Sequence, residues 1–594
     1  MKQRVADYIA DFLVSHGITT MFSVVGGGAM HLNDAFGKKE GLRVYHNHHE
    51  QACAMAAEGY TRQSGTPAAV CVTTGPGGTN AMTGVLGAYQ DNIPMLVISG
   101  QVRYSTTVES TGLNLRQFGP QEYCIIDSVK PMTKYAKMIR DPKEIRYELE
   151  KAYHIANTGQ KGPVWLDIPL NVQGASIDFD CMEKYNVIDE QRDYKAIATK
   201  IISILKNAER PLILAGADIR NANVHNEFVN LINKMSIPVV AATCVADILP
   251  LTNKNYYGNF GLIGGRTGNF LVQNADVILA LGIGLSFFDT SFNYESFSPK
   301  SYKIMISSNA DEMRKPNISI DFPVIADTEK LITELLNTCE GSCITNSSWI
   351  NYAETLKGKF NLFDNVKINK KVNPYILARK LVEKLLDYSA IVTGNSSGSS
   401  MALHYGIEKD NQRLFGNVSC GSMGWDLPAA IGVALANKNN QTVCLTGDGS
   451  IQMNLQELQT VVRYNIPLKI MIYSNGGYMG IVRTQNNFFE GRLTGCTPES
   501  GLDLPDFEKI ANAYEIPYMR IEKNEDIDDK LNEFFKINGF AICELFEDSE
   551  QGPALKLASR KLDSGEMVSA PFDDLTPLLE RNVYNKYKDY RNFL

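Results

Sequence analysis

The sequence predicts an α/β protein built from three doubly wound domains with parallel sheets. Three observations support this fold class: apolar runs rich in Val, Ile and Leu recur along the chain, helix-length stretches separate them, and they fall into three blocks joined by polar segments. Uninterrupted apolar runs indicate strands buried on both faces, which form parallel sheets covered by helices. At roughly 100–200 residues per domain, a chain of 594 residues can hold three such domains.

The first block is predicted to form a domain over residues 1–180. It opens with residues 5–13, VADYIADFL, whose apolar side chains recur at helical spacing. This pattern predicts an amphipathic helix and not a signal peptide. Residues 68–74 (AAVCVTT) and 95–100 (MLVISG) are then predicted to be buried strands.

The second and third blocks are predicted over residues 190–340 and 365–555. Polar segments at 181–195 and 340–370 precede them, and a tail over 556–594 carries mixed charges and aromatic residues typical of a segment docked on the surface or on a neighbouring chain. The strands of these blocks are expected at 211–216, 238–243, 277–282, 390–395, 442–447 and 468–475.

Composition excludes several classes of partner. The net charge is −8, which argues against binding to nucleic acid or to an anionic membrane. No uncharged apolar run approaches the roughly 18 residues that a membrane span needs, so we expect a cytoplasmic protein. The eleven cysteines lack the spacing of a disulfide framework, as in a reducing compartment.

A carboxylate and an amide are predicted to meet at one edge of the third sheet. Asp448 follows the strand at 442–447, and Asn475 ends the next strand, one strand–helix–strand unit later. The apolar spacing of Ile451, Leu455, Leu458, Val461 and Val462 predicts the helix between them. Right-handed crossovers bring both strand ends to the same edge, where such folds bind ligands. Oxygen ligands of this kind suit Mg²⁺ bound to a diphosphate, and Gly449, Gly476 and Gly477 allow close backbone approach. The unit is no P-loop, because no stretch of the chain supplies the required Lys-Ser/Thr ending.

This arrangement resembles the signature of thiamine diphosphate (ThDP) enzymes. Their Gly-Asp-Gly is followed by an Asn-Asn turn, for which this chain has Ser474-Asn475. The resemblance implies that Asp448, Asn475 and the carbonyl of Gly477 hold Mg²⁺.

The stretch HHEQACAMAAEGYTRQSG (48–65) resembles the acetolactate synthase family and places Glu50 at its catalytic glutamate. In that family this carboxyl lies against N1′ of the aminopyrimidine, where burial suits the sharing of a proton with a ring nitrogen. By itself, the residue could equally begin a helix or form an ion pair. The adjacent His48 and His49 cannot both face one ion from a regular element, so we expect a structural role for them and not a zinc site.

Further stretches resemble the same family over roughly residues 1–555, and the resemblance implies two groups of site residues. Met423 would wedge under the cofactor and the carbonyl of Gly421 would accept from its 4′-amino group. The full set of implied cofactor-binding residues is Thr74, Asn80, Ser396, Ser397, Gly398, Gly421, Met423, Gly447, Asp448, Gly449, Ser450, Asn475, Gly477 and Tyr478. The substrate would meet Gly26, Gly27, His31, Gln121, Arg483 and Thr484, of which His31 and Arg483 could equally have structural or surface roles.

The chain also departs from the acetolactate synthase pattern. Pro120 replaces an aromatic residue at the donor pocket, and Thr484 replaces a Trp of the acceptor pocket, which opens room for a bulkier acceptor. GNSSGSS (394–400) replaces the usual diphosphate-binding segment. The middle block lacks the motifs that accompany flavin but keeps GGRTGNF (264–270), a candidate nucleotide-phosphate site, so FAD binding is left open.

The resemblance implies decarboxylation of a 2-oxo acid, with pyruvate as the expected donor, and transfer of a two-carbon unit to an acceptor carbonyl. The motifs come closest to members associated with surface-polysaccharide and branched-sugar biosynthesis, which suggests a keto-sugar acceptor. A true acetolactate synthase and a simple 2-oxo acid decarboxylase are the alternatives. Because Glu50 and the metal-binding residues lie in different domains, and because the family joins such surfaces from two chains, a homodimer or homotetramer is expected.

Overall fold

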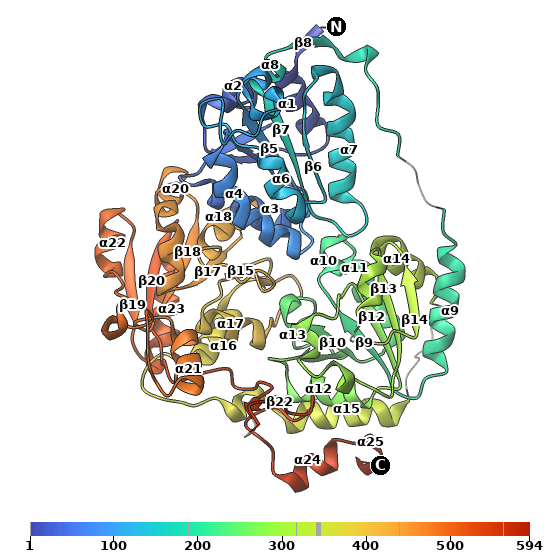
Figure 1. The fold of residues 1–594 in the computed structure, drawn as a ribbon. Coiled ribbons are helices and arrows are strands. Elements are labelled where there is room, and N and C mark those ends of the chain that lie inside the picture. Colours follow the sequence, from blue (N-terminus) through green and yellow to red (C-terminus); the bar gives the residue numbers. More distant parts are fainter. Residues whose placement is uncertain are drawn as a thin grey trace.

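Three six-stranded sheets, each with all its strands parallel, organise the molecule. The computed structural model describes residues 2–187, 191–316, 318–339, 346–438, 440–561 and 564–593. Figure 1 shows the three sheets as separate bodies with helices on their faces and the C-terminal tail beneath the central one. The predicted fold class of three doubly wound α/β domains is therefore confirmed.

The first domain has the strand order β3-β2-β4-β5-β7-β6. The order reverses between β2 and β4, so the segments after these two strands meet at the switch point where such sheets bind ligands. Its strands are β2 (Thr20–Ser23), β3 (Arg43–His46), β4 (Ala69–Val72), β5 (Met95–Gln101), β6 (Tyr135–Met138) and β7 (Pro163–Pro169), with a small β1 (Lys2–Arg4) and β8 (Ser176–Asp178) pair. Its helices include α1 (Val5–Ser15), α2 (Met30–Lys38), α3 (Glu50–Ser64), α4 (Pro76–Gln90), α5 (Val108–Thr111), α6 (Ile125–Val129), α7 (Ile145–Asn157) and α8 (Leu170–Gln173).

The central domain has the strand order β11-β10-β9-β12-β13-β14. Its strands are β9 (Pro211–Ala215), β10 (Val239–Ala242), β11 (Tyr256–Phe260), β12 (Val277–Leu281), β13 (Tyr302–Ser307) and β14 (Phe322–Ile325). Its helices are α9 (Tyr194–Lys206), α10 (Asp218–Asn221), α11 (His225–Met235), α12 (Arg266–Asn274), α13 (Phe287–Thr290), α14 (Thr328–Thr338) and α15 (Ser347–Lys359).

The third domain has the order β16-β15-β17-β18-β20-β19, with its switch point between β15 and β17. Its strands are β15 (Ala390–Thr393), β16 (Arg413–Gly416), β17 (Thr442–Gly447), β18 (Leu468–Ser474), β19 (Tyr518–Ile521) and β20 (Ala541–Phe546). Its helices are α16 (Pro374–Lys384), α17 (Ser397–Tyr405), α18 (Asp426–Asn437), α19 (Asp448–Ile451), α20 (Leu458–Arg463), α21 (Met479–Phe488), α22 (Phe507–Ala513) and α23 (Ile527–Lys536).

The helix expected after Asp448 is interrupted in the structure. The 3₁₀ segment Gln452–Glu457 separates α19 from α20, and Asn454 within it has φ −139° and ψ 33°. The side chain of Asn454 donates to the carbonyl of Gly424 (2.8 Å) and to Gln51 of the first domain (3.2 Å). These tertiary hydrogen bonds hold Asn454 in a non-helical conformation. The spacing of apolar residues, which favours a continuous helix here, does not predict them.

The first and third domains pack through α3 and α18, which glycines bring into close contact (Figure 1). A Cβ on Gly432 would lie 1.9 Å from the carbonyl oxygen of Ala56, and one on Gly59 would lie 2.2 Å from that of Ala429. Any larger residue would force the two backbones apart.

A buried charge cluster joins the same two domains. Arg62 pairs with Glu58 (2.7 Å) and with Asp91, and Glu58 also accepts from the indole of Trp425 (2.8 Å). Burial acts against the charge of Arg62, but the two carboxylates raise its pKa overall, so the guanidinium remains ionised.

The tail docks on the central domain of the same chain. Arg266 of α12 donates to the carbonyls of Leu575 (3.0 Å) and Pro577, and Asn269 donates to that of Phe572 (2.8 Å). The tail includes β21 (Ser559–Lys561), β22 (Met567–Ser569), α24 (Arg581–Tyr587) and α25 (Tyr590–Phe593).

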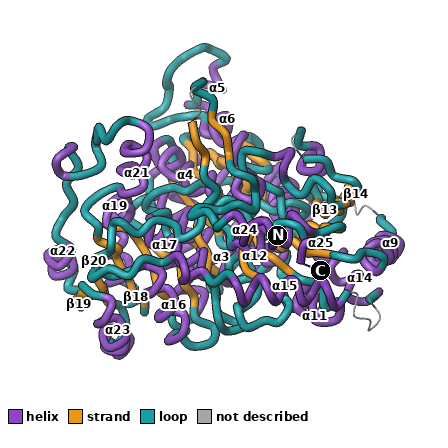
Figure 2. Tube along the Cα trace, turned by 90° about the horizontal axis from the view of Figure 1, so that it is seen from below, coloured by secondary structure: helices purple, strands orange, loops and turns teal. Residues whose placement is uncertain are grey.

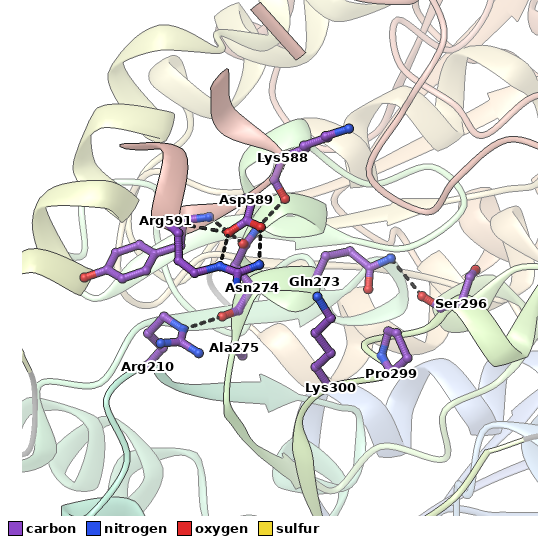
Figure 3. Close-up of a pocket in the computed structure, with 11 residues that line it drawn as sticks. Arg210, Gln273, Asn274, Ala275, Ser296, Pro299, Lys300, Lys588, Asp589 and Arg591 are labelled. Atoms are coloured by element: carbon purple, nitrogen blue, oxygen red, sulfur yellow. Dashed lines mark hydrogen bonds and ion pairs between the residues drawn. The ribbon is translucent and has the colours of Figure 1, made fainter. Parts of the chain in front are cut away.

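Asn274, the last residue of α12, fastens the end of the tail. Its amide nitrogen donates to the carbonyl of Lys588 (3.2 Å), and its oxygen accepts from the backbone N–H of Tyr590 (2.8 Å). Figure 3 shows Asn274 beside Lys588 and Asp589, with Arg591 paired to Asp589. In the described ranges, no helix is both long and apolar enough to cross a membrane.

Candidate active site

A cavity of about 210 Å³ lies at the carboxyl edge of the third sheet, at its switch point. All its lining residues follow β15, β17 and β18 or belong to the segment before α18, so one domain supplies them all. The lining residues are Asn395, Ser396, Met423, Gly447, Asp448, Gly449, Ser450, Asn475, Gly477, Tyr478, Met479, Gly480 and Ile481. Nine of these were predicted from the sequence as cofactor or metal ligands, so the tertiary fold does bring them together.

Asp448 is held rigidly by backbone donors. Its Oδ1 accepts from the N–H of Gly449 (2.8 Å), and its Oδ2 accepts from those of Asn475 (2.9 Å) and Gly476 (3.0 Å). Burial raises the pKa of this carboxyl, while the three N–H groups act in the opposite direction. A cation beside a desolvated carboxylate would favour its charged form.

Asn475 carries an oxygen without a partner. Its amide nitrogen donates to Glu547 (2.8 Å), whereas its Oδ1 is buried and finds no hydrogen-bond partner in the described part of the chain. An unsatisfied buried acceptor costs about 1–3 kcal/mol, which a metal ion bound there would recover. Burial raises the pKa of Glu547 to about 7.

The backbone around Gly477 completes an oxygen-rich cradle. Gly476 has φ +79°, and a Cβ on Gly477 would lie 2.2 Å from the carbonyl oxygen of Cys496. The Gly477 carbonyl accepts from Met479 N–H (3.1 Å) and keeps a second lone pair. No group of three or more His, Cys, Asp or Glu side chains that could hold a metal occurs among the described residues. The donor set is therefore one carboxylate, one amide and one carbonyl, which suits Mg²⁺ completed by phosphate oxygens and water.

Glu50 begins α3 in the first domain and is buried, with only 9% of its surface exposed. Its Oε2 accepts from the amide of Asn80 (3.0 Å), another residue predicted from the sequence. The N-cap of α3 is His49, whose Nδ1 accepts from the Gln51 N–H (3.1 Å). Glu50 thus begins a helix, as the simpler interpretation held, but it is also a buried carboxyl held by an amide.

The loop before Glu50 is anchored to the third domain. Glu457 accepts from the amide of Asn47 (2.8 Å) and from the backbone N–H of His48 (3.0 Å). None of the residues lining the 210 Å³ cavity comes from the first domain.

Family comparisons agree with this geometry. The N-terminal TPP binding domain, the central domain and the C-terminal TPP binding domain of thiamine pyrophosphate enzymes match residues 3–122, 198–335 and 393–545. The chain belongs to the thiamine pyrophosphate enzymes. It is similar to the acetolactate synthase large subunit of Haemophilus influenzae, with 30% identity over 90% of this chain and 92% of that protein.

Other relatives carry the same description. Acetolactate synthase isozyme 3 large subunit of Escherichia coli is 28% identical over 89% of this chain and 91% of that protein. A probable acetolactate synthase large subunit of Methanocaldococcus jannaschii is 30% identical over 89% of each chain. This thiamine pyrophosphate enzyme is therefore a ThDP-dependent carboligase of the acetolactate synthase-like type.

The segment 394–400 of this thiamine pyrophosphate enzyme begins α17. Ser396 caps the helix by accepting from the Ser399 N–H (3.1 Å), and a Cβ on Gly398 would lie 2.7 Å from the ring of Tyr473. Ser397 is the first residue of α17, and its side chain lies outside what the structure describes. Asn395, which the sequence prediction omitted, donates to the carbonyl of Gly421 (2.7 Å).

The predicted donor-pocket residues meet at the switch point of the first sheet. Gly26 packs against Thr73, since an added Cβ would lie 2.5 Å from that side chain, and Gly27 has open space around it. A Cβ on Gly75 would lie 2.1 Å from the carbonyl oxygen of Gln121. Gln121 is exposed, and its φ is +61°.

Thr74 and His31 lie in the same region with other contacts. The Thr74 hydroxyl donates to the carbonyl of Gly100 (3.1 Å), and the ring of His31 lies against Gly174.

Arg483 and Thr484 lie on α21, directly after the turn at 475–477. Arg483 donates to the carbonyls of Ser549 (2.9 Å) and Gln551 (2.7 Å), so it anchors the loop after β20. The Thr484 hydroxyl donates to Gly480 within the helix (3.1 Å). Glu547 could not be predicted as a site residue, because it is 72 positions from Asn475 and no motif marks it.

The GGRTGNF motif of the central domain starts α12 and is engaged by the tail. The side chains of Arg266 and Asn269 both donate hydrogen bonds to backbone carbonyls of the tail. These side chains therefore have a structural partner within the chain.

Proposed function

We propose that this enzyme uses ThDP and Mg²⁺ to decarboxylate a 2-oxo acid, with pyruvate as the donor, and to transfer the two-carbon unit to an acceptor carbonyl. The observation that carries this proposal is the unpartnered Oδ1 of Asn475 in the cavity that Asp448 also lines. In this position, Asp448, Asn475 and the carbonyl of Gly477 would hold Mg²⁺.

The remaining lining residues suit the cofactor. Ser396, Ser450 and the backbone of Gly447 and Gly449 would hold the diphosphate, and Met423 would support the rings. When bound, ThDP supplies the electron sink that carbon–carbon cleavage and formation require. Glu50 would exchange a proton with N1′ of the aminopyrimidine, and Asn80 would keep its carboxyl in place.

The site is completed by a second copy of the chain in this proposal. The residues that line the 210 Å³ cavity all belong to the third domain, whereas Glu50 lies in the first domain. Apolar side chains are exposed on both domains: Leu113 (62%) and Phe118 (55%) follow α5, and Phe488 (55%) and Phe489 (51%) end α21. Figure 2 shows the α5 region projecting from the body of the molecule, as an arm that could reach a partner. A homodimer or homotetramer would cover these residues.

The acceptor is proposed to be a keto sugar of a surface-polysaccharide or branched-sugar route in the cytoplasm. Thr484 supports this proposal, because a Thr in place of the family's Trp leaves room for an acceptor larger than a second 2-oxo acid. A true acetolactate synthase, in which a second 2-oxo acid is the acceptor, is favoured by the names of the relatives.

One experiment separates these possibilities. Purified protein with ThDP, Mg²⁺ and pyruvate is incubated alone, with extra 2-oxo acid and with a panel of keto sugars, and carbon dioxide and product masses are measured. A sugar heavier by one acetaldehyde unit supports the proposal, acetolactate supports the second candidate, and free acetaldehyde supports a simple decarboxylase. Glu50→Gln should abolish carbon dioxide release; full activity in that variant would refute the assignment.

A further inference from the structure

A second cavity, of about 380 Å³, lies between the central and third domains and shares no lining residue with the proposed cofactor cavity. Its walls come from β11, the start of α12, the end of α15 with the segment after it, α16, α17 and Leu555, elements that Figure 1 places around the junction of the two domains. Its volume lies in the usual range for small-molecule sites, roughly 300–1,000 Å³.

The charged groups of this cavity are all cations. Arg266, Lys357 and Arg379 line it, and no carboxylate does so among the described residues. Arg266 is only 3% exposed. Two nearby acids accept from tyrosine hydroxyls: Glu354 from that of Tyr257 (2.8 Å) and Glu408 from that of Tyr405 (2.6 Å). Glu383 lies 3.8 Å from Nε of Arg379 but does not line the cavity. The cavity therefore favours a negatively charged occupant.

His404 lines the same cavity and carries a buried ring nitrogen, Nε2, that lacks a hydrogen bond of standard geometry. The Ala554 N–H donates to the hydroxyl oxygen of Tyr375 (2.8 Å), which leaves that hydroxyl free to donate to Nδ1 of His404 (2.9 Å). Nε2 must then carry the ring proton. Burial lowers the pKa of His404 to about 4, with a smaller opposing effect of the Gly264 backbone, so the ring is neutral near pH 7.

Nε2 is buried and makes no hydrogen bond of standard geometry among the described residues, although the Gly264 backbone lies close enough to oppose the lowering of the ring's pKa. A buried donor without an acceptor is unfavourable. An acceptor oxygen of a ligand would satisfy this donor. Because three cationic side chains line the cavity, a negatively charged ligand is favoured.

Aromatic rings form much of the remaining wall. Tyr257, Phe360, Phe363 and Tyr405 all line the cavity, and the guanidinium of Arg379 lies 4.6 Å from the ring centre of Phe363. Such walls suit a flat apolar body. We propose that this cavity is a binding site for a small organic anion, a carboxylate or phosphate carried on a planar ring.

The site lies away from the proposed chemistry, so its ligand would act by joining domains. Its walls include parts of the central domain, the segment leading into the third domain, helices α16 and α17 of the third domain, and Leu555, which immediately precedes the tail. Binding would stabilise this junction and raise the melting temperature of the holoenzyme.

The test uses the full chain saturated with ThDP and Mg²⁺, which occupy the diphosphate pocket. Two matched pairs of probes are titrated by calorimetry: benzoate against benzamide, and AMP against adenosine. At least one charged member should bind with a Kd below about 1 mM and at least about tenfold tighter than its neutral partner. If neither charged probe binds with a Kd below about 1 mM, or if each neutral partner binds as tightly as its charged counterpart, the proposal is overturned.

Variants then locate the bound probe. Arg379→Gln, at a partly exposed position, and His404→Phe should each weaken binding of the charged probe at least about fivefold. Lys300→Gln is the matched control, because Lys300 lines a different cationic pocket of the central domain (Figure 3). Unchanged binding in both cavity variants, or loss only in the control, would place the anion elsewhere and overturn the proposal. If His404→Phe fails to fold, Arg379→Gln alone decides.

Discussion

Glu547 fixes the orientation of Asn475: its carboxylate accepts the amide N–H across 2.8 Å and so leaves the amide oxygen as the group available to a metal. Glu547 is 1% exposed and directly follows β20, so its position is set by the end of that strand and not by the turn that carries Asn475. Hydrogen-bond partners of metal ligands typically contribute 10–100-fold to metal affinity.

For Glu547→Ala we expect the Kd for Mg²⁺ to rise by about 10–100-fold, because the amide can then turn. Glu547→Gln retains an acceptor oxygen and should lose less than about fivefold. Electron paramagnetic resonance of bound Mn²⁺ in the presence of ThDP measures the affinity. Glu544→Ala is the control, since that carboxylate accepts from Tyr518 instead (2.6 Å). Equal metal affinity in the wild type and in Glu547→Ala would contradict the prediction.

Gly432→Ala should destabilise the contact between the first and third domains by about 1–3 kcal/mol, because the new methyl group meets a carbonyl oxygen of α3. Gly480→Ala on α21 has no neighbour within 4 Å and serves as the control, with no such cost. Differential scanning calorimetry of both variants measures the effect. A melting temperature for Gly432→Ala equal to that of Gly480→Ala would show that the helices have room to separate.

Stability should fall between about pH 6.5 and pH 4 through two buried histidines. Burial lowers the pKa of both His404 and His225 to about 4 from a usual value near 6.5. The unfolded chain therefore binds more protons than the native state in this window, and stability is lost as the pH falls. His404→Gln and His225→Gln should each flatten the pH dependence of the melting temperature. An unaltered pH profile in both variants would contradict this origin.

Asn274→Ala should loosen the C-terminal tail. It removes the hydrogen bonds to Lys588 and Tyr590, each worth about 0.5–1.5 kcal/mol, so cleavage of the tail in limited proteolysis should accelerate about tenfold or more. Gln273→Ala is the matched control, because this neighbouring side chain donates to Ser296 within the central domain (2.8 Å; Figure 3). Equal cleavage rates in the two variants would indicate that the aromatic contacts of the tail suffice.

The strands and the meeting of Asp448 with the turn at Asn475 could be predicted from local patterns. Apolar runs such as TVCLTG and LKIMIYS became β17 and β18, because burial on both faces leaves no polar alternation to obscure them. Asp448 and Asn475 could be paired because two consecutive parallel strands must end at the same edge. Glycine-rich and carboxylate motifs next to strand ends can be recognised from a short stretch of sequence, without knowledge of the tertiary structure.

Other features depend on residues that meet only in three dimensions. Asn454 interrupts a helix that its apolar periodicity favoured, because its side chain bonds to Gly424 and Gln51. The family resemblance suggests Arg483 as a substrate ligand, but in the structure its guanidinium donates to carbonyls of the loop after β20. Asn395 and Glu547 join the site from other strand ends, without a motif of their own.

The sequence by itself determined the fold class and the ThDP-type motifs, and it predicted that Asp448 and Asn475 meet at one sheet edge, since each depends on periodicity or on spacing across one strand–helix–strand unit. Only the tertiary structure decided which amide oxygen stays unpaired, where the tail docks, and that a cationic cavity forms around His404. These depend on hydrogen bonds and packing between segments more than a hundred residues apart or on different strands, which sequence order does not encode locally.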